Sequence, residues 1–172
     1  MRSECCNATA VSWERAHGAH GSAQHVEGEP VATRPHRRSP LVLMAEDDFE
    51  MRSLMATALR AMGYHVREFE DGRQLRECLE SLKRNGRIAD VDLIISDIVM
   101  PGASGFEVLV GLDEWRRTIP FIAISAFGDE NTHAAAHALG AVAMFDKPFD
   151  LEELKALAAR LVPPAGASAH HN

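Results

Sequence analysis

The sequence predicts a single α/β domain in which five parallel strands form a doubly wound sheet covered by helices on both faces. Three observations support this prediction. The chain has 172 residues, a length that suits one domain and is short for two. With 46% hydrophobic and 25% charged residues, its composition is that of an ordinary globular protein. Between residues 41 and 162, short apolar runs alternate five times with stretches of helical period, and right-handed crossovers then favour a doubly wound parallel sheet.

The first two strand–helix units show both periods. Residues 41–45 (LVLMA) are wholly apolar, as expected of a strand buried on both faces. Residues 48–62 form one apolar helical face that ends before Gly63; it contains Met51, Leu54, Met55, Ala58, Leu59 and Met62. Residues 64–69 alternate as a strand does. A helix then opens at Asp71-Gly72, and its apolar face contains Leu75, Cys78, Leu79 and Leu82.

The remaining three units repeat the same order. Residues 91–96 read as a second buried strand. Further helices are expected over 105–115, 129–139 and 151–162, and further strands over 121–125 and 141–145. In doubly wound sheets, ligands bind beyond the carboxyl ends of the strands, near the switch in strand order. We therefore expect the chemistry of this chain just after each strand.

Both ends of the chain lack these periods. Residues 1–39 are rich in Gly, His, Arg, Ala and Glu and finish in a basic run (RPHRRSP, 34–40), so we predict a disordered N-terminal arm. The domain itself is expected over 40–162. Residues 163–172 open with two prolines and are expected to form a disordered C-terminal tail.

The sequence also bears on location. Its apolar runs are interrupted by acidic residues well before the eighteen needed for a transmembrane helix. The N-terminus carries Cys5, Cys6 and polar residues where a signal peptide needs an apolar core. Three cysteines are an odd number, which favours reduced thiols. We therefore expect a cytoplasmic protein with no membrane contact.

The charge of the domain excludes one class of partner. Residues 41–162 hold 13 basic and 21 acidic side chains. Because nucleic-acid phosphates reward positive charge, a domain this acidic is a poor direct binder of nucleic acid. Clustered acids can instead hold a hard cation such as Mg²⁺.

Polar side chains follow four of the five predicted strands. Glu46, Asp47 and Asp48 come directly after the first strand, and Asp97 follows the third. The fourth strand ends at Ser125, and Lys147 follows the fifth, so all these groups should converge on one edge of the sheet. Crowded carboxylates stay ionised together only when a cation lies among them.

This inventory suits phosphoryl transfer. Mg²⁺ prefers a few carboxylates together with water and phosphate oxygens. A carboxylate beside the metal can attack phosphorus and form an aspartyl phosphate, while Ser125 and Lys147 supply donors for the phosphoryl oxygens. A lone Asp-Asp pair after a strand is usually a helix cap; the other strand-end groups favour the functional interpretation.

Four motifs in this order resemble the receiver domains of two-component response regulators, and the stand-alone chemotaxis type in particular. They are LVLMAEDDFEMR from Leu41, IISDIVMPGASG from Ile94, IAISA from Ile122 and FDKPF from Phe145. The resemblance spans essentially all of 41–162. It implies a flavodoxin-like sheet with strand order 2-1-3-4-5.

The resemblance also implies residue roles. Asp97 would be the phosphoacceptor, and Glu46 and Asp47 the acidic pair that holds Mg²⁺, with Asp47 as a direct ligand. Val99 would offer its backbone carbonyl to the metal. Ser125 would follow the phosphoryl group, and Lys147 would pair with it from a position before a cis proline, Pro148. Asp48 falls outside the acidic pair, so we expect it to cap the first helix.

Two departures from the family pattern carry expectations of their own. The switch position on the fifth strand, usually aromatic, is Met144, while Phe145 should point to the opposite face of the sheet. Met can slide into the space an aromatic ring would take. Val99 and Phe127 place apolar bulk where water would reach the acyl phosphate, so we expect slow self-dephosphorylation.

The rival interpretations fail to different degrees. A haloacid-dehalogenase-type phosphatase needs a second Asp two residues beyond its nucleophile, and position 99 is Val. A flavin carrier needs a first loop that binds phosphate, which Glu46, Asp47 and Asp48 would repel. A receiver-like interaction module that is never phosphorylated stays open as the alternative. Such modules typically lose an acid or the lysine, and this chain keeps all five positions.

The resemblance implies the partners as well. The phosphoryl donor would be a histidine kinase or a histidine phosphotransfer protein, and the chain would catalyse no reaction beyond transfer to its own Asp97. Only ten residues follow Val162, so we expect output by protein–protein contact. Phosphorylation would shift the face built by the fourth helix, fifth strand and fifth helix.

Overall fold

The computed structural model describes residues 38–126 and 128–165. The predicted arm over 1–39 and tail over 163–172 lie outside the described residues except at their inner ends, 38–39 and 163–165. In the inner end of the arm, Arg38 donates to the Asp92 carboxylate at 2.9 Å. Just before the tail, the Val162 carbonyl accepts the Tyr64 hydroxyl at 2.6 Å.

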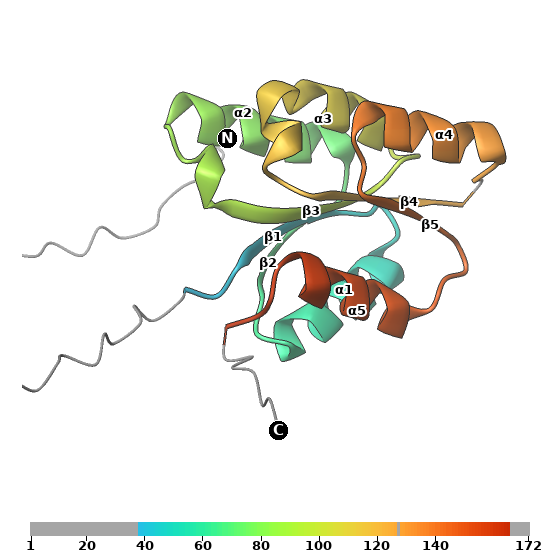
Figure 1. Cartoon of the computed structure of the whole chain (residues 1–172), viewed down its shortest axis with the longest axis horizontal. Coiled ribbons are helices and arrows are strands. Elements are labelled where there is room, and N and C mark those ends of the chain that lie inside the picture. The colour runs from blue at the N-terminus through green and yellow to red at the C-terminus, as the bar shows by residue number, and fades with distance from the viewer. Residues whose placement is uncertain (1–37, 127, 166–172) are drawn as a thin grey trace, which may run out of the picture. The chain divides into compact units, whose positions relative to one another are not determined.

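Five parallel strands form one sheet in the order β2-β1-β3-β4-β5, which confirms the predicted topology (Figure 1). The strands are β1 (Leu41–Ala45), β2 (His65–Phe69), β3 (Val91–Asp97), β4 (Phe121–Ser125) and β5 (Ala143–Asp146). The strand order reverses between β1 and β3, so the loops after these two strands flank the crevice where ligands bind in such sheets.

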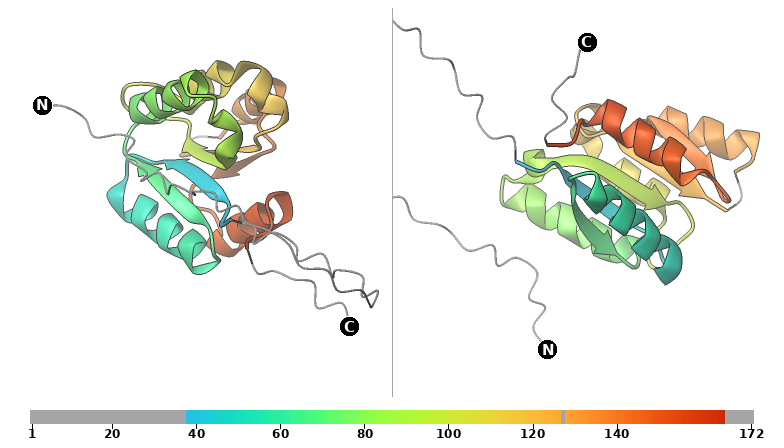
Figure 2. Two further views of the ribbon diagram at one scale, coloured as in Figure 1. Left: turned by 90° about the vertical axis from the view of Figure 1, so that its left-hand side faces the viewer. Right: turned by 90° about the horizontal axis from the view of Figure 1, so that it is seen from below.

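Helices cover both faces of the sheet. One face carries α1 (Phe49–Ala61) and α5 (Leu151–Leu161), and the other carries α2 (Gly72–Arg84), α3 (Gly105–Gly111) and α4 (Glu130–Leu139) (Figures 1 and 2). Within the described residues, no helix is long and apolar enough to span a bilayer.

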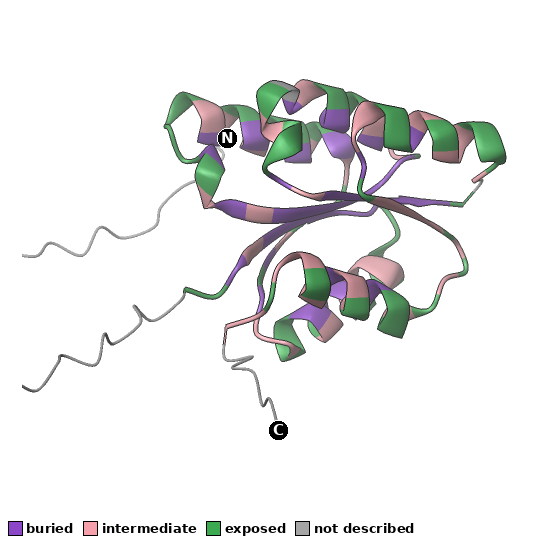
Figure 3. Ribbon diagram, viewed as in Figure 1, coloured by how far each residue is buried: buried purple, intermediate pink, exposed green. Residues whose placement is uncertain are grey.

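The core consists of two apolar layers, one on each side of the sheet. Leu93 and Ile95 of β3 pack toward α1 and α5, whereas Ile94 packs toward α2 and α3. All three are fully buried, and each such side chain contributes about 1.5–3 kcal/mol by leaving water. Most of the central sheet is coloured as buried in Figure 3. Both faces of β3 are covered, and its central residues 93–95 form a continuous apolar run, as expected of a buried parallel strand.

Each α-helix in the described part of the chain begins at a short polar side chain that accepts a backbone N–H of the first turn. These caps are Asp48, Asp71, Ser104, Asp129 and Asp150. Asp48 accepts from the Met51 N–H at 2.8 Å, which confirms its predicted role as a cap. Because Asp48 caps α1 only three residues after β1 ends, residues 46 and 47 lie close to the end of the strand.

The third helix is shorter than predicted. It was expected over 105–115, but α3 ends at Gly111 and a 3₁₀-helix (Asp113–Arg117) follows. The low helix propensity of Gly111 weakens the last turn. The tighter 3₁₀ turn then brings the buried Ile119 toward the start of β4.

The fifth strand begins two residues later than expected. The left-handed Gly140 ends α4 with a φ of 105°, and the N–H of Ala141 closes back onto the Ala136 carbonyl. Ala141 therefore belongs to this turn, whereas the Val142 N–H donates to the Phe121 carbonyl of β4 at 2.9 Å. Pairing of β5 with β4 starts at Ala143, opposite Ile122.

Candidate functional site

The strand-end residues meet at one edge of the sheet. In the parallel register, Ala45 lies opposite Ser96, Asp97 opposite Ile124, and Ser125 opposite Asp146. Glu46 and Lys147 each follow their strand by one residue. The sheet therefore brings together side chains from the carboxyl ends of four strands, β1, β3, β4 and β5.

Lys147 joins two carboxylates that are almost excluded from water. Its Nζ lies 2.7 Å from Glu46 Oε1 and 2.5 Å from Asp97 Oδ2. The side chains of Glu46 and Asp97 are 0% and 4% exposed. Burial opposes the charge on Lys147, but the hydrogen bonds to both carboxylates outweigh it and raise the pKa of the ammonium. The predicted cis peptide before Pro148 is confirmed.

The two carboxylate oxygens of Glu46 differ in their hydrogen bonding. Oε1 accepts hydrogen bonds from the Lys147 ammonium and, at 3.3 Å, from the Asp48 N–H. Oε2 is buried and has no hydrogen-bond partner among the described residues. Burial, with the nearby charge of Asp97, raises the pKa of Glu46, although the Lys147 hydrogen bond lowers it in part. An unsatisfied buried oxygen beside a second carboxylate is suited to a cation.

The geometry of three carboxylates fits a hard divalent ion. Glu46, Asp47 and Asp97 can each offer one oxygen such that all three lie within 4.8 Å of one another. Oxygens on an octahedral Mg²⁺ sit about 2.1 Å from the metal, so two opposite ligands are roughly 4.2 Å apart. Asp47 is exposed, which leaves the solvent side open for water or phosphate oxygens. The residues present therefore fit Mg²⁺.

Asp97 is oriented by the loop that follows it. Its Oδ1 accepts the Val99 N–H at 2.8 Å, while Oδ2 faces Lys147. The Ser96 hydroxyl donates to the Asp97 carbonyl at 2.9 Å, a contact that sequence reasoning missed because Ser96 lies inside the strand. The Val99 side chain is exposed. The roles of the Val99 carbonyl and of Val99 in dephosphorylation stay predictions, and Phe127 lies outside the described residues.

Ser125 is buried at the last position of β4. Its carbonyl accepts the Lys147 N–H at 2.7 Å, which ties the ends of β4 and β5 together. The role of its hydroxyl toward a phosphoryl group stays a prediction.

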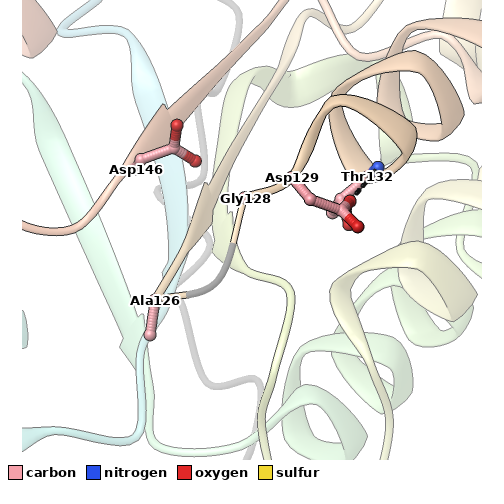
Figure 4. Close-up of a pocket in the computed structure, with 5 residues that line it drawn as sticks. All are labelled: Ala126, Gly128, Asp129, Thr132 and Asp146. Carbon is pink, nitrogen blue, oxygen red and sulfur yellow. Dashed lines mark hydrogen bonds between the residues drawn. The ribbon is translucent and has the colours of Figure 1, made fainter.

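The loop from β4 to α4 passes beneath a His–Asp pair that sequence reasoning did not identify. His133 Nε2 lies 2.9 Å from the Asp146 carboxylate. A Cβ on Gly128 would come within 1.6 Å of that carboxylate, so a larger residue here would displace the Asp146 side chain from its present position. Figure 4 shows the pocket at this point, which is lined by Ala126, Gly128, Asp129, Thr132 and Asp146.

Met144 and Phe145 pack on opposite sides of β5, as predicted. Met144 joins the apolar layer beneath α2, α3 and α4, whereas Phe145 joins the layer beneath α1 and α5. Phe145 also contacts Phe149, with ring centroids 5.6 Å apart. Met144 lies opposite Ala123 on β4, two residues before Ser125, so the side chain at the switch position is a flexible thioether.

Comparison with known proteins identifies the same family that the sequence motifs resemble, and the match covers most of the chain. Residues 42–159 match the response regulator receiver domain family. Response regulator RR06 of Streptococcus pneumoniae is 35% identical over 123 residues, which cover 69% of this chain and 53% of that protein. The DNA-binding transcriptional regulator NtrC of Escherichia coli is 30% identical over 122 residues, covering 71% of this chain and 24% of that protein. The matched region thus spans about half of one relative and a quarter of the other.

Solved structures agree with the fold. The chemotaxis protein CheY4 of Vibrio cholerae aligns with a TM-score of 0.60 and 28% identity, covering 72% of this chain and 99% of that one. The receiver domain of a putative LuxO repressor protein from Vibrio parahaemolyticus aligns with a TM-score of 0.62 and 25% identity, covering 72% and 89%.

Proposed function

The chain belongs to the response-regulator receiver family, and from this membership we propose that Asp97 accepts a phosphoryl group from a phosphohistidine of a histidine kinase or histidine phosphotransfer protein. One observation carries the proposal. The Asp97 carboxylate is held between the Lys147 ammonium and the Val99 N–H, beside Glu46 and Asp47. An ordered carboxylate that contacts a fixed cation and belongs to a fitting metal site is equipped to attack phosphorus.

Transfer requires one bond to form and one to break. An Asp97 oxygen forms the new P–O bond as the P–N bond of the donor phosphohistidine breaks, and the released imidazole nitrogen takes up a proton. Lys147 stays protonated because its pKa is raised, so it can hold a phosphoryl oxygen as charge moves onto the product. Glu46, Asp47 and Asp97 would hold Mg²⁺, which when bound neutralises charge on the phosphoryl oxygens.

The proposed signal leaves the site through β4 and β5. Phosphorylation draws the Ser125 hydroxyl toward the new phosphoryl oxygens. Because the Ser125 carbonyl binds the Lys147 N–H, the end of β5 and the loop to α4 respond together. A shift of the α4–β5–α5 face then changes contact with a downstream protein. Catalysis by the chain is limited to transfer onto its own Asp97.

A mass measurement tests the proposal. Purified protein is incubated with acetyl phosphate or phosphoramidate, with MgCl₂ or with EDTA, and its intact mass is recorded. We expect one phosphoryl adduct that requires MgCl₂ and is absent in Asp97→Asn. Asp92→Asn is the matched control, because Asp92 lies on the same strand and pairs with Arg38 at the opposite end. That variant should be phosphorylated like the wild type.

Two outcomes contradict the proposal. An adduct that persists in Asp97→Asn would place the phosphoryl group elsewhere. A folded wild-type protein that gains no adduct from either donor would instead favour the phosphorylation-independent interaction module. The face of α4 would then be the surface to test for constitutive partners.

A further inference from the structure

Beyond the residues that touch the metal or the phosphoryl group, we propose that Arg52 is the positioning residue of the acidic loop formed by residues 46–48. In this role, Arg52 holds the loop backbone so that Glu46 and Asp47 face a Mg²⁺ ion together. The proposal rests on the proposed function for the identity of the ion. It assigns a role in the site to a residue that lies outside the carboxylate cluster.

The guanidinium of Arg52 reaches back over the start of α1 to the loop. Its Nη1 donates to the Glu46 carbonyl at 2.6 Å and approaches the Asp47 carbonyl at 3.3 Å. Side chains in a helix lean toward its N-terminus, so a residue in the first turn is well placed for this reach. The two carbonyls belong to the two residues whose carboxylates point to the proposed metal. Fixing both peptide groups therefore fixes the origin of both carboxylates.

The guanidinium is itself held in place. Its Nε lies 3.9 Å from a carboxylate oxygen of Glu68 on β2, and its Cζ lies 5.6 Å from the centroid of the Phe49 ring. The Arg52 side chain is only 12% exposed. Helix α1 runs beside β2 (Figure 1), so one side chain links the strand, the helix and the loop. A planar donor set anchored on several sides is a rigid support.

A positioning role for Arg52 and the charge of Arg52 predict opposite changes in Mg²⁺ affinity when the residue is replaced. Arg52 carries a positive charge close to an acidic cluster, so its removal by charge alone would strengthen Mg²⁺ binding. If Arg52 instead supports the loop, its removal weakens Mg²⁺ binding, because residues that orient metal ligands typically contribute roughly 10–100-fold in affinity. The sign of the change therefore separates the two effects.

The experiment compares Arg52→Gln, Arg52→Lys and Arg60→Gln with the wild type, all without phosphodonor. Arg60 lies on the same helix and contacts the same Glu68 at 2.8 Å, and it donates to the Val66 carbonyl instead of the loop. Its substitution therefore disturbs Glu68 without touching residues 46–48. The dissociation constant for Mg²⁺ is measured by titrating MgCl₂ into the ¹⁵N-labelled protein.

We expect Arg52→Gln to raise the Mg²⁺ dissociation constant roughly tenfold. Arg52→Lys should raise it by a smaller factor, because an ammonium keeps the charge but cannot form the planar fork. Arg60→Gln should leave it within about twofold of the wild type. Urea unfolding in EDTA checks that each variant is folded, and Arg52→Lys carries the test if Arg52→Gln is not.

A second readout needs neither metal nor phosphate. In EDTA, the amide order parameters of Asp47 and Asp48 should fall from the rigid range, about 0.85, toward the flexible range, below about 0.6, in Arg52→Gln alone. The proposal is overturned if Arg52→Gln binds Mg²⁺ as tightly as the wild type, or if Arg60→Gln weakens binding equally. It is also overturned if the loop amides stay ordered. If Arg52→Gln weakens Mg²⁺ binding and loosens the loop but wild-type Asp97 is not phosphorylated, the proposed function is overturned and the role of Arg52 stands.

Discussion

Replacing Lys147 with methionine should destabilise the metal-free protein strongly at neutral pH. The substitution keeps the aliphatic length of the side chain and removes the ammonium that joins Glu46 and Asp97. Two carboxylates would then face each other with almost no access to water. The effect therefore comes from the charges that remain and owes little to lost packing.

The magnitude follows from the burial of the three groups. Removing one partner of a buried ion pair costs about 3–5 kcal/mol, because the other charge is left uncompensated. The Lys147 side chain is 19% exposed while those of its partners are at most 4% exposed, so we expect the lower end, about 3 kcal/mol. At roughly 4 °C per kcal/mol for a domain of this size, Tm should fall by about 12 °C.

The loss of stability in Lys147→Met should become smaller as the pH falls. The folded pKa of Glu46 is already raised above 4.5, and removing Lys147 takes away the hydrogen bond that lowers it. A carboxylate whose folded pKa is raised favours folding below its unfolded pKa, and that contribution is lost as pH rises through the folded pKa. The deficit of Lys147→Met should therefore be largest at neutral pH and shrink on acidification. Addition of MgCl₂ should also reduce it, because a cation then lies among the carboxylates.

Urea unfolding followed by circular dichroism in EDTA, at about pH 7.5 and about pH 5, measures the free energy of unfolding. Lys155→Met is the matched control, because Lys155 forms an i,i+3 pair on α5 with the exposed Glu152. Such a surface pair contributes less than about 1 kcal/mol. Equal stability of the two variants at neutral pH would refute the reasoning, as would a Lys147→Met deficit that grows on acidification.

Three further predictions concern the scaffold. Gly105→Ala should destabilise the protein by about 2 kcal/mol or more in urea unfolding, because a Cβ there would lie 2.4 Å from the backbone carbonyl oxygen at the end of β3. Gly111→Ala meets no atom within 4 Å and should stabilise α3 by up to about 1 kcal/mol, and a loss of stability would contradict this. Hydrogen bonds from the backbone and side chain of Ser104 lower the pKa of Glu107, so the capping contribution is present above the ordinary glutamate pKa and lost as pH falls through the lowered one. An NMR titration should therefore find Glu107 with a pKa below the ordinary value in the wild type and shifted upward in Ser104→Ala.

Much of the fold is encoded locally, and this explains why it could be predicted. The apolar run of β1 and the helical face of α1 are properties of consecutive residues, and Asp48 caps the helix through a contact three residues away. Met144 and Phe145 point to opposite faces because strand side chains alternate. The end of α3 at Gly111 was missed because the apolar pattern continues past it, while the chain must turn to deliver Ile119 to the core.

The membership of the candidate site was predictable for a related reason. Parallel strands end at one edge of a sheet, so polar residues that follow strands converge there whatever the details of the loops. Glu46, Asp97 and Lys147 could be grouped from their positions alone, and the structure brings them into direct contact.

What the sequence determined by itself was thus the rhythm of strands and helices, the helix cap and the group of residues at the sheet edge. The tertiary structure alone decided which atoms meet: the two bonds of Arg52 to the loop carbonyls, its anchor on Glu68, and the pairing of His133 with Asp146 over Gly128. Periodicity and capping depend on neighbours within one or two turns, and a sequence records them directly. Contacts between side chains on different elements depend on strand order, register and helix placement, which exist only once the chain has folded.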